Sequence, residues 1–193
     1  MNKNTEQVSL SIEVMKMKKL VLLIVATLIL IGVINNYEED YYIIPDKSIR
    51  IRIIPNSNNI KDQYLKKQVK TNIELEIEND LKNSKTIDNS RKIIKQNLNK
   101  YKSTIKEVQK QENINQKYSI DYGYHHFPEK IYKGVKYQEG NYESLLITLG
   151  QGKGDNWWCV LFPPICSLET NDHNTKNIEY SLYVKEMFNK YIK

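Results

Sequence analysis

Two cysteines, two adjacent histidines and a run of glycines are the residues whose types and spacing could do chemistry. Cys159 and Cys166 are separated by six residues, Val-Leu-Phe-Pro-Pro-Ile, and follow directly on a pair of tryptophans. Two thiols at this spacing are too few ligands for a zinc site, which needs four donors or three and a water. A nucleophilic thiol and a disulfide therefore remain as the two chemical uses of the pair.

The nucleophilic alternative would be a thiol hydrolase built from Cys159, one of the histidines and Asp155. His125 and His126 are neighbours in the chain, so in a strand their side chains point to opposite faces and cannot bind one ion together. A sulfur in a disulfide cannot act as a nucleophile, so pairing of the cysteines would exclude the hydrolase. We expect no catalytic residue, no metal and no cofactor.

The glycine run, Gly150-Gln-Gly152-Lys-Gly154, resembles a phosphate-binding loop only superficially. A Walker loop has four residues between its glycines and then Gly-Lys-Ser/Thr, and a dinucleotide fold has Gly-x-Gly-x-x-Gly at the start of a helix. Neither spacing is present. We interpret these glycines as residues that permit positive φ angles in a tight turn, which presents the segment that follows.

Two helices should support this region from the first half of the chain. Residues 48–54 alternate between isoleucine and arginine, which predicts a half-buried strand. Apolar residues recur every four positions over residues 60–81, and again at three and four over residues 88–108. The short connection, residues 83–86, predicts that the two helices are antiparallel neighbours.

The second half is rich in glycine, tyrosine and proline, and predicts strands and turns. Candidate strands cover residues 118–127, 134–138 and 142–149. The sequence Gln-Glu-Gly-Asn at 138–141 would join the last two into a hairpin. Residues 178–192 have the apolar spacing of a weak terminal helix.

The N-terminal region has the layout of an export signal or a membrane anchor. Leu20 to Ile34 is an apolar stretch of 15 residues preceded by three lysines, and the acidic cluster Glu38-Glu39-Asp40 follows it. Basic residues before and acidic residues after such a segment predict that the chain from about Tyr37 onward lies outside the cytoplasm. No small-residue cleavage pattern ends the stretch, which favours an uncleaved anchor over a cleaved signal.

An extracytoplasmic location indicates which of the two chemical roles of the cysteine pair to expect. An even pair in an oxidising compartment forms a disulfide by default. We therefore predict the pairing Cys159–Cys166, with Pro163-Pro164 stiffening the loop between them. The predicted fold is α+β: a strand followed by an antiparallel helix pair, then a small β layer with a disulfide-stapled loop.

The net charge of +6 does not by itself indicate a nucleic-acid partner. Only three of the 29 basic residues are arginine, the type favoured for phosphate and base recognition. Lysine, isoleucine, asparagine and tyrosine, which AT-rich codons encode, are all abundant. We attribute much of the charge to codon usage and predict no nucleic-acid binding.

The cysteine loop also contains a dense apolar cluster that allows two interpretations. The cluster comprises Trp157, Trp158, Val160, Leu161, Phe162 and Ile165. It could form the core of a small β layer, or part of it could be a rigid aromatic contact surface. Strand alternation favours a mixture, with one tryptophan turned inward and the other outward.

The run from Gly152 to Cys166, Gly-Lys-Gly-Asp-Asn-Trp-Trp-Cys-Val-Leu-Phe-Pro-Pro-Ile-Cys, resembles the stage II sporulation protein R family. Two further segments fit the same family. The first runs from Ile49 to Val69 through Asn56-Ser57, Asp62-Gln63 and Lys66, and the second includes Phe127-Pro128, Tyr132, Gly140, Tyr142 and Glu143. Together they span about residues 44–167.

The resemblance implies a non-enzymatic signalling protein of endospore formation. Such a protein is exported from the forespore into the space between two membranes, where it activates the membrane-embedded aspartic protease that processes pro-sigma-E in the mother cell. We accordingly divide the chain into a cytoplasmic N-terminus with its signal or anchor (1–36), an extracytoplasmic signalling domain (37–168) and a C-terminal extension (169–193).

The stapled loop is the predicted contact with this protease, because no active site can be assembled elsewhere. The expected partner-binding residues are Gly152, Lys153, Gly154, Asp155, Asn156, Trp157, Trp158, Phe162, Pro163 and Pro164. An alternative is an extracytoplasmic module that binds cell-wall peptidoglycan, with Trp157, Trp158 and tyrosines as stacking platforms for sugars.

Overall fold

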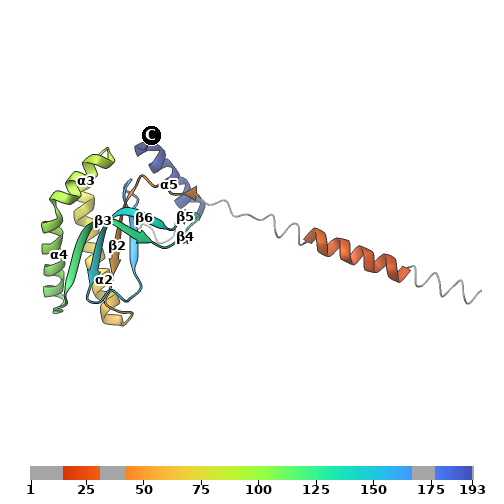
Figure 1. Ribbon diagram of the computed structural model, residues 1–193, viewed down its shortest axis with the longest axis horizontal. Coiled ribbons are helices and arrows are strands. Elements are labelled where there is room, and N and C mark those ends of the chain that lie inside the picture. Colours follow the sequence, from red (N-terminus) through yellow and green to blue (C-terminus); the bar gives the residue numbers. More distant parts are fainter. Residues whose placement is uncertain (1–14, 31–41, 167–176, 193) are drawn as a thin grey trace, which may run out of the picture. The chain divides into compact units, whose positions relative to one another are not determined.

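The chain divides into two units, Met1–Asp40 and Tyr41–Lys193. The computed structural model describes residues 15–30, 42–166 and 177–192. In the first unit, residues 15–30 form a helix (Figure 1). Every residue of this helix is exposed. No helix among the described residues is both long and apolar enough to cross a membrane. Residues 31–34 of the expected apolar segment, and the acidic cluster after it, lie outside the described residues.

The second unit is organised around a four-stranded sheet with the order β3-β6-β2-β7. Its strands are β2 (Ile49–Ile54), β3 (Tyr118–Phe127), β6 (Gly140–Leu149) and β7 (Trp157–Phe162). β2 lies in the middle, parallel to β6 and antiparallel to β7. The predicted alternation of β2 is confirmed, because Ile49, Ile51 and Ile53 are fully buried in one core cluster. The prediction that the strand is only half-buried is wrong, because Arg50 on its other face is also fully buried.

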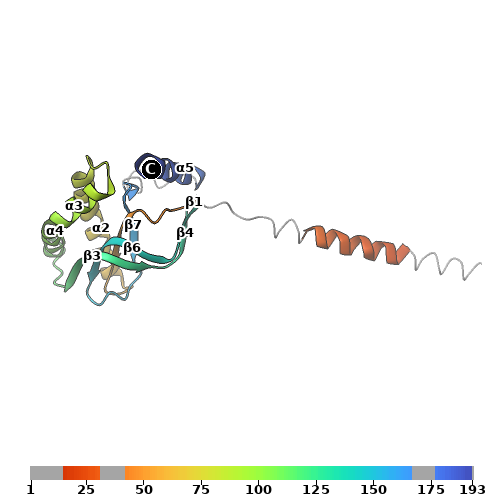
Figure 2. The same ribbon diagram turned by 45° about the horizontal axis from the view of Figure 1, so that its top comes forward.

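Three helices cover the face of the sheet to which these isoleucines point: α2 (Ile60–Leu81), α3 (Ile87–Gln96) and α4 (Leu98–Gln111) (Figures 1 and 2). The stripe predicted for α2 is buried along its whole length: Leu65, Val69, Ile73, Ile77 and Leu81. The single second helix predicted over residues 88–108 is wrong, because the chain breaks at Asn97. The backbone N–H of Asn97 bonds to Ile93 O and Ile94 O and ends α3, while its side chain donates to Asp80 Oδ2 at 3.1 Å.

A three-stranded sheet with the order β1-β5-β4 forms a separate small layer. Its strands are β1 (Tyr42–Ile43), β4 (Lys130–Tyr132) and β5 (Val135–Tyr137). The predicted hairpin between β5 and β6 is wrong: β5 pairs with β4, and β6 pairs with β3 over ten residues. The turn that joins β4 to β5 is Lys133-Gly134, where both residues have positive φ (47° and 75°), as a two-residue hairpin turn of type I′ requires.

The small sheet and α5 (Asn177–Tyr191) enclose a second core on the other face of the large sheet (Figure 2). Its buried members are Ile44, Phe127, Val135, Tyr137, Tyr142, Trp158, Val160, Ile165, Tyr180, Val184 and Phe188. A terminal helix was predicted and is present. It contributes Tyr180, Val184 and Phe188 to this core, so it packs as part of the same unit.

Candidate functional site

Two segments far apart in the sequence form one bonded surface. We call residues 55–59, Pro-Asn-Ser-Asn-Asn, the asparagine turn, and residues 150–156 the glycine loop. Four backbone amides of the glycine loop donate to the asparagine turn: Gln151 N to Asn56 Oδ1 (2.9 Å), Lys153 N to Asn56 O (3.1 Å), Gly154 N to Pro55 O (3.1 Å) and Asp155 N to Asn58 Oδ1 (2.5 Å). The turn therefore fixes the path of the loop residue by residue.

The glycines of the loop are required by this close approach. Gly150 and Gly152 have positive φ (59° and 64°), which confirms the predicted role of the run. A Cβ on Gly150 would lie 2.3 Å from Asn56 Oδ1, and one on Gly154 would lie 2.3 Å from Ser57 O. Real Cβ atoms do not approach that closely, so side chains at these two positions would separate loop from turn.

Asp62, in the first turn of α2, fixes the asparagine turn through hydrogen bonds to its carboxylate. Its carboxylate accepts hydrogen bonds from Ser57 Oγ (2.6 Å), Asn56 Nδ2 (2.9 Å), Asn59 Nδ2 (2.9 Å) and Gln116 Nε2 (3.3 Å). Burial opposes ionisation of this carboxyl, but the hydrogen bonds outweigh burial and hold the pKa of Asp62 below its ordinary value. In return, Asp62 N donates to Asn59 Oδ1, the N-cap of α2.

Lys66, one turn further along α2, ties the helix to the end of the glycine loop. Its Nζ donates to Asp155 O at 2.8 Å and to Gln63 Oε1 at 2.6 Å. Partial burial lowers the pKa of Lys66. The matched segments of the family resemblance, the turn, Asp62-Gln63, Lys66 and the glycine loop, are thus assembled in one place.

The ten predicted partner-binding residues differ widely in exposure. Lys153 and Asp155 are exposed; Gly152, Gly154, Asn156, Trp157 and Pro164 are half-buried; Trp158, Phe162 and Pro163 are buried. Trp158 is 8% exposed and Phe162 1%, so both side chains are occupied within the second unit. The surface that this loop offers in the described residues is its tip, around Lys153 and Asp155.

The cysteines form the predicted disulfide, Cys159–Cys166, with Cα atoms 5.7 Å apart. Cys159 lies in β7, and Cys166 follows the Pro163-Pro164 turn. Both are buried at the helix-covered face of the sheet. The pairing removes the free thiol that the hydrolase alternative requires. It also places the disulfide inside the core, on the helix-covered face of β7, which is the strand that follows the glycine loop.

Sequence reasoning considered His125 but missed the serine and the aspartate that this histidine meets on β3 and β6. His125 Nδ1 lies 2.7 Å from Ser144 Oγ, and His125 Nε2 lies 2.9 Å from Asp121 Oδ2. Gly123 lies between the histidine and the aspartate on the strand, and a Cβ there would make only ordinary contacts with them, at 3.7 Å to Asp121 and 3.9 Å to His125. Ser144 is fully buried, so its hydroxyl cannot reach a substrate, and the group acts as a polar bridge across the sheet.

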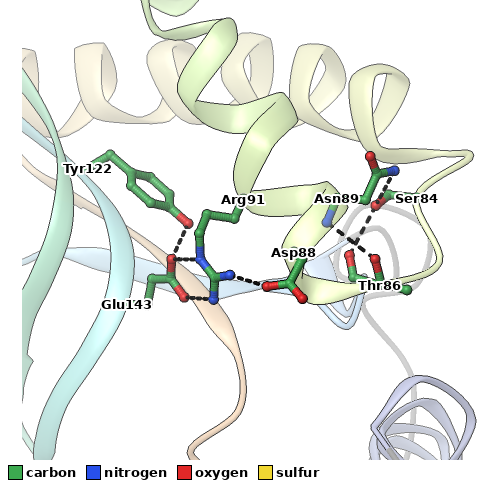
Figure 3. A network of polar contacts seen from close by, with 7 residues as sticks. All are labelled: Ser84, Thr86, Asp88, Asn89, Arg91, Tyr122 and Glu143. Atoms are coloured by element: carbon green, nitrogen blue, oxygen red, sulfur yellow. Dashed lines mark hydrogen bonds and ion pairs between the residues drawn. The ribbon is translucent and has the colours of Figure 1, made fainter.

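A second missed group clamps α3 onto the sheet (Figure 3). Arg91 Nε and Nη2 donate to the two carboxylate oxygens of Glu143 at 2.5 and 2.8 Å, and Tyr122 Oη donates to Glu143 at 2.8 Å. Arg91 also bonds to Asp88 within α3. Burial alone would raise the pKa of Glu143, but the bonds from Arg91 and Tyr122 lower it overall. Only Glu143 of this group was noted, through the resemblance.

The class of protein that this fold and site define is a small α+β domain with a disulfide-bonded loop, in which main-chain amides of a glycine loop donate hydrogen bonds to an asparagine turn. The profile of the family described as stage II sporulation protein R matches residues 45–172. The chain therefore belongs to the stage II sporulation protein R family.

A curated relative, stage II sporulation protein R of Bacillus subtilis (strain 168), is 42% identical over 132 residues. The aligned region covers 68% of this chain and 59% of the relative, which is less than two thirds of the relative's length. No solved structure matches the chain significantly.

Proposed function

We propose that this chain is a sporulation signal exported from the forespore, and that it activates the membrane-embedded aspartic protease that processes pro-sigma-E in the mother cell. Membership of the stage II sporulation protein R family supports the sporulation role. The N-terminal lysines and the apolar stretch that follows them support export, either through an uncleaved anchor or through a cleaved signal. The protein itself carries out no catalysis in this proposal.

The observation that carries the proposal is the joined surface of asparagine turn and glycine loop. Its backbone is fixed by four amide hydrogen bonds to the turn and by Lys66 Nζ on Asp155 O. A loop already fixed in its bound shape loses little entropy when a partner binds. Lys153 and Asp155 project from it as exposed charges, which suits recognition of a polar protein surface.

Activation then follows from selective binding. The protease exists in inactive and active states, and a ligand shifts that balance only through a difference in its affinity for the two. We propose that the tip of the glycine loop contacts the extracytoplasmic face of the protease and binds the active state more tightly. A tenfold shift in the balance needs a difference of about 1.4 kcal/mol, which a few fixed polar contacts can supply.

The test uses the endospore former that encodes this chain, with its own gene deleted and replaced by variants. The double charge reversal Lys153→Glu with Asp155→Lys alters two exposed side chains and leaves the four backbone amides that donate to the asparagine turn in place, although it also removes the attraction of the Asp155 carboxylate for Lys66. We expect it to reduce pro-sigma-E processing at least tenfold while the protein accumulates normally. The matched control reverses an adjacent exposed pair on α4, Lys106→Glu with Glu107→Lys, and should process normally. Normal processing by the loop variant would refute the proposed contact.

The peptidoglycan-binding alternative has less support from the positions of the aromatic rings. Trp158 is enclosed by Phe127 and Tyr137, with ring centroids 5.5 and 4.9 Å away. Trp157 is half-buried, with Lys70 Nζ 4.9 Å from its centroid. Neither ring is an open stacking platform for a sugar. Retention of the purified chain on isolated peptidoglycan, with no partner protein present, would nevertheless favour this alternative.

A further inference from the structure

A small pocket lies where β4 and the end of β5 meet the start of β7. It has a volume of about 110 Å³ and is lined by Lys130, Tyr132, Tyr137, Trp157 and Trp158. Four of its five lining residues are aromatic and the fifth is a cation; none is acidic. The volume is well below the roughly 300–1,000 Å³ typical of sites for drug-sized ligands, so the pocket suits one side chain rather than a whole small molecule.

The lysine in this pocket is held in place by the rings around it. Lys130 Nζ lies 5.3 Å from the centroid of Trp158 and 5.6 Å from that of Tyr132. Such cation–π contacts fix the position of an ammonium group but do not neutralise its charge. Glu129 and Glu139, which flank β4 and β5 in the chain, contact other cations: Glu129 lies 3.1 Å from Lys136, and Glu139 lies 3.6 Å from His126. Among the described residues no carboxylate forms an ion pair with Lys130, so its ammonium is available there to an anion.

A second, fully buried cation lies behind the pocket wall. Arg50 has no exposed surface, and its guanidinium carbon lies 3.3 Å from the centroid of Tyr142 and 6.0 Å from that of Tyr137. Within the described part of the chain, none of its three guanidinium nitrogens has a hydrogen-bond partner. The carboxylate of Asp46 attracts this guanidinium. A buried charge whose nitrogens make no hydrogen bond is nevertheless costly, and low-dielectric surroundings screen its positive potential only weakly.

We propose that this pocket binds the carboxylate side chain of an aspartate or glutamate on the partner protein. The proposal deepens the proposed function, on which it rests, by stating the chemistry of the partner surface. The carboxylate would meet Lys130 directly, its methylene groups would pack on the tyrosine and tryptophan rings, and Arg50 would add attraction from behind Tyr137. Because Trp157 also follows the glycine loop, an acidic residue in the pocket and a contact at the loop tip could belong to one interface.

The test is a titration of the isotope-labelled full chain, kept in a mild detergent because the side chains of residues 15–30 are exposed and largely apolar. The probe is glutamate blocked at both ends as N-acetyl and N-methylamide, and the readout is the NMR shift of the two indole N–H groups. We expect a saturable shift, and at least tenfold weaker binding of the equally blocked glutamine. Inorganic phosphate should bind no more tightly than blocked glutamate, because the pocket is shaped for a flat anion on an apolar stem.

Substitutions of single residues test whether blocked glutamate binds in this pocket. Lys130→Gln should weaken binding of blocked glutamate about tenfold. The matched control Lys95→Gln removes another lysine that stacks on a tyrosine, with Nζ 5.4 Å from the Tyr122 centroid but outside the pocket lining, and should leave binding unchanged. Arg50→Met should also weaken binding, with the indole spectrum as the check on folding; if that variant does not fold, Lys130→Gln alone decides.

Equal binding of blocked glutamine, tighter binding of phosphate, or an unchanged response of Lys130→Gln would overturn the inference. The titration contains no protease, so its failure leaves the sporulation role intact. Conversely, carboxylate binding by a chain that does not support pro-sigma-E processing would uphold the pocket and refute the proposed function.

Discussion

Replacing Gly154 by alanine tests whether the glycine loop and the asparagine turn form one structural unit. The added Cβ would lie 2.3 Å from Ser57 O, 2.5 Å from Ser57 C and 2.8 Å from Pro55 Cγ. Two of these three atoms belong to the backbone, so no side-chain rotation relieves the overlap. The loop must move away from the turn, and the bonds from Gly154 N and Lys153 N to the turn are then lost.

The size of the effect follows from these contacts. Overpacking of a well-packed site costs about 1–3 kcal/mol, and each lost hydrogen bond about 1 kcal/mol. With two hydrogen bonds lost, we expect a total loss of about 3–5 kcal/mol in the free energy of unfolding, a large part of the roughly 5–15 kcal/mol typical of a domain. With a urea dependence of about 2 kcal/mol per molar, the unfolding midpoint should fall by about 1.5–2.5 M.

The assay is urea unfolding of the full chain followed by tryptophan fluorescence, because Trp157 and Trp158 begin directly after the loop. The matched control is Gly123→Ala in β3, where the nearest atoms to the new Cβ are 3.7 and 3.9 Å away. Alanine in a strand should be neutral or slightly stabilising relative to glycine there. If both variants unfold at the same urea concentration, the close contact between loop and turn does not contribute to stability and our reasoning fails.

Two further predictions concern carboxylates. Asp62→Asn should lower the free energy of unfolding by about 1–2 kcal/mol at pH 7. Because the pKa of Asp62 in the folded state is lowered, this difference in stability from wild type should be fully present at pH values above the ordinary pKa of 3.8. It should disappear as the pH falls through the folded-state pKa. Glu143→Gln should cost about 1–2 kcal/mol by weakening the bidentate bond from Arg91, and the same loss should be absent in an Arg91→Gln background.

Unfolding curves measured from pH 2 to pH 7 check the first of these predictions, and a double-mutant cycle at pH 7 checks the second. A difference between Asp62→Asn and wild type that stayed constant across this range would show that the carboxylate is not the stabilising form. Additive effects of the two clamp substitutions would show that Arg91 and Glu143 contribute independently.

The spacing of apolar residues was sufficient to predict the helices and strands in which buried positions recur at a regular interval. The stripe of α2 and the alternation of β2 gave correct elements because one face of each is fully buried. The end of α3 at Asn97 could not be predicted, since apolar spacing continues into α4 and the break depends on a contact with Asp80 on another helix. The hairpin was misplaced because Gly140-Asn141 and Lys133-Gly134 are both acceptable turn sequences, and long-range pairing with β3 decides between them.

The sequence was sufficient to predict which segments of the chain form the site, but not which of their side chains are exposed. The disulfide and the positive φ of Gly150 and Gly152 followed from residue type. Burial of Trp158 and Phe162 did not, because the residues that cover them, such as Tyr137 and Tyr191, come from β5 and α5. The Arg91–Glu143 clamp joins residues 52 positions apart, and no local pattern indicates such a pair.

The position of β2 at the centre of the large sheet has a consequence for how the domain folds. Its partners arrive late in the chain: Ile51 pairs with Leu145 and with Cys159, which are 94 and 108 positions further on. Pairings at such separations make folding slow, because much loop entropy must be lost before the contacts that compensate for it can form. The edge of β2 that faces β7 cannot be paired until β7, which comes later in the chain than β6, is present. A chain exported as proposed would therefore emerge without its central sheet, and would complete its fold only after translocation.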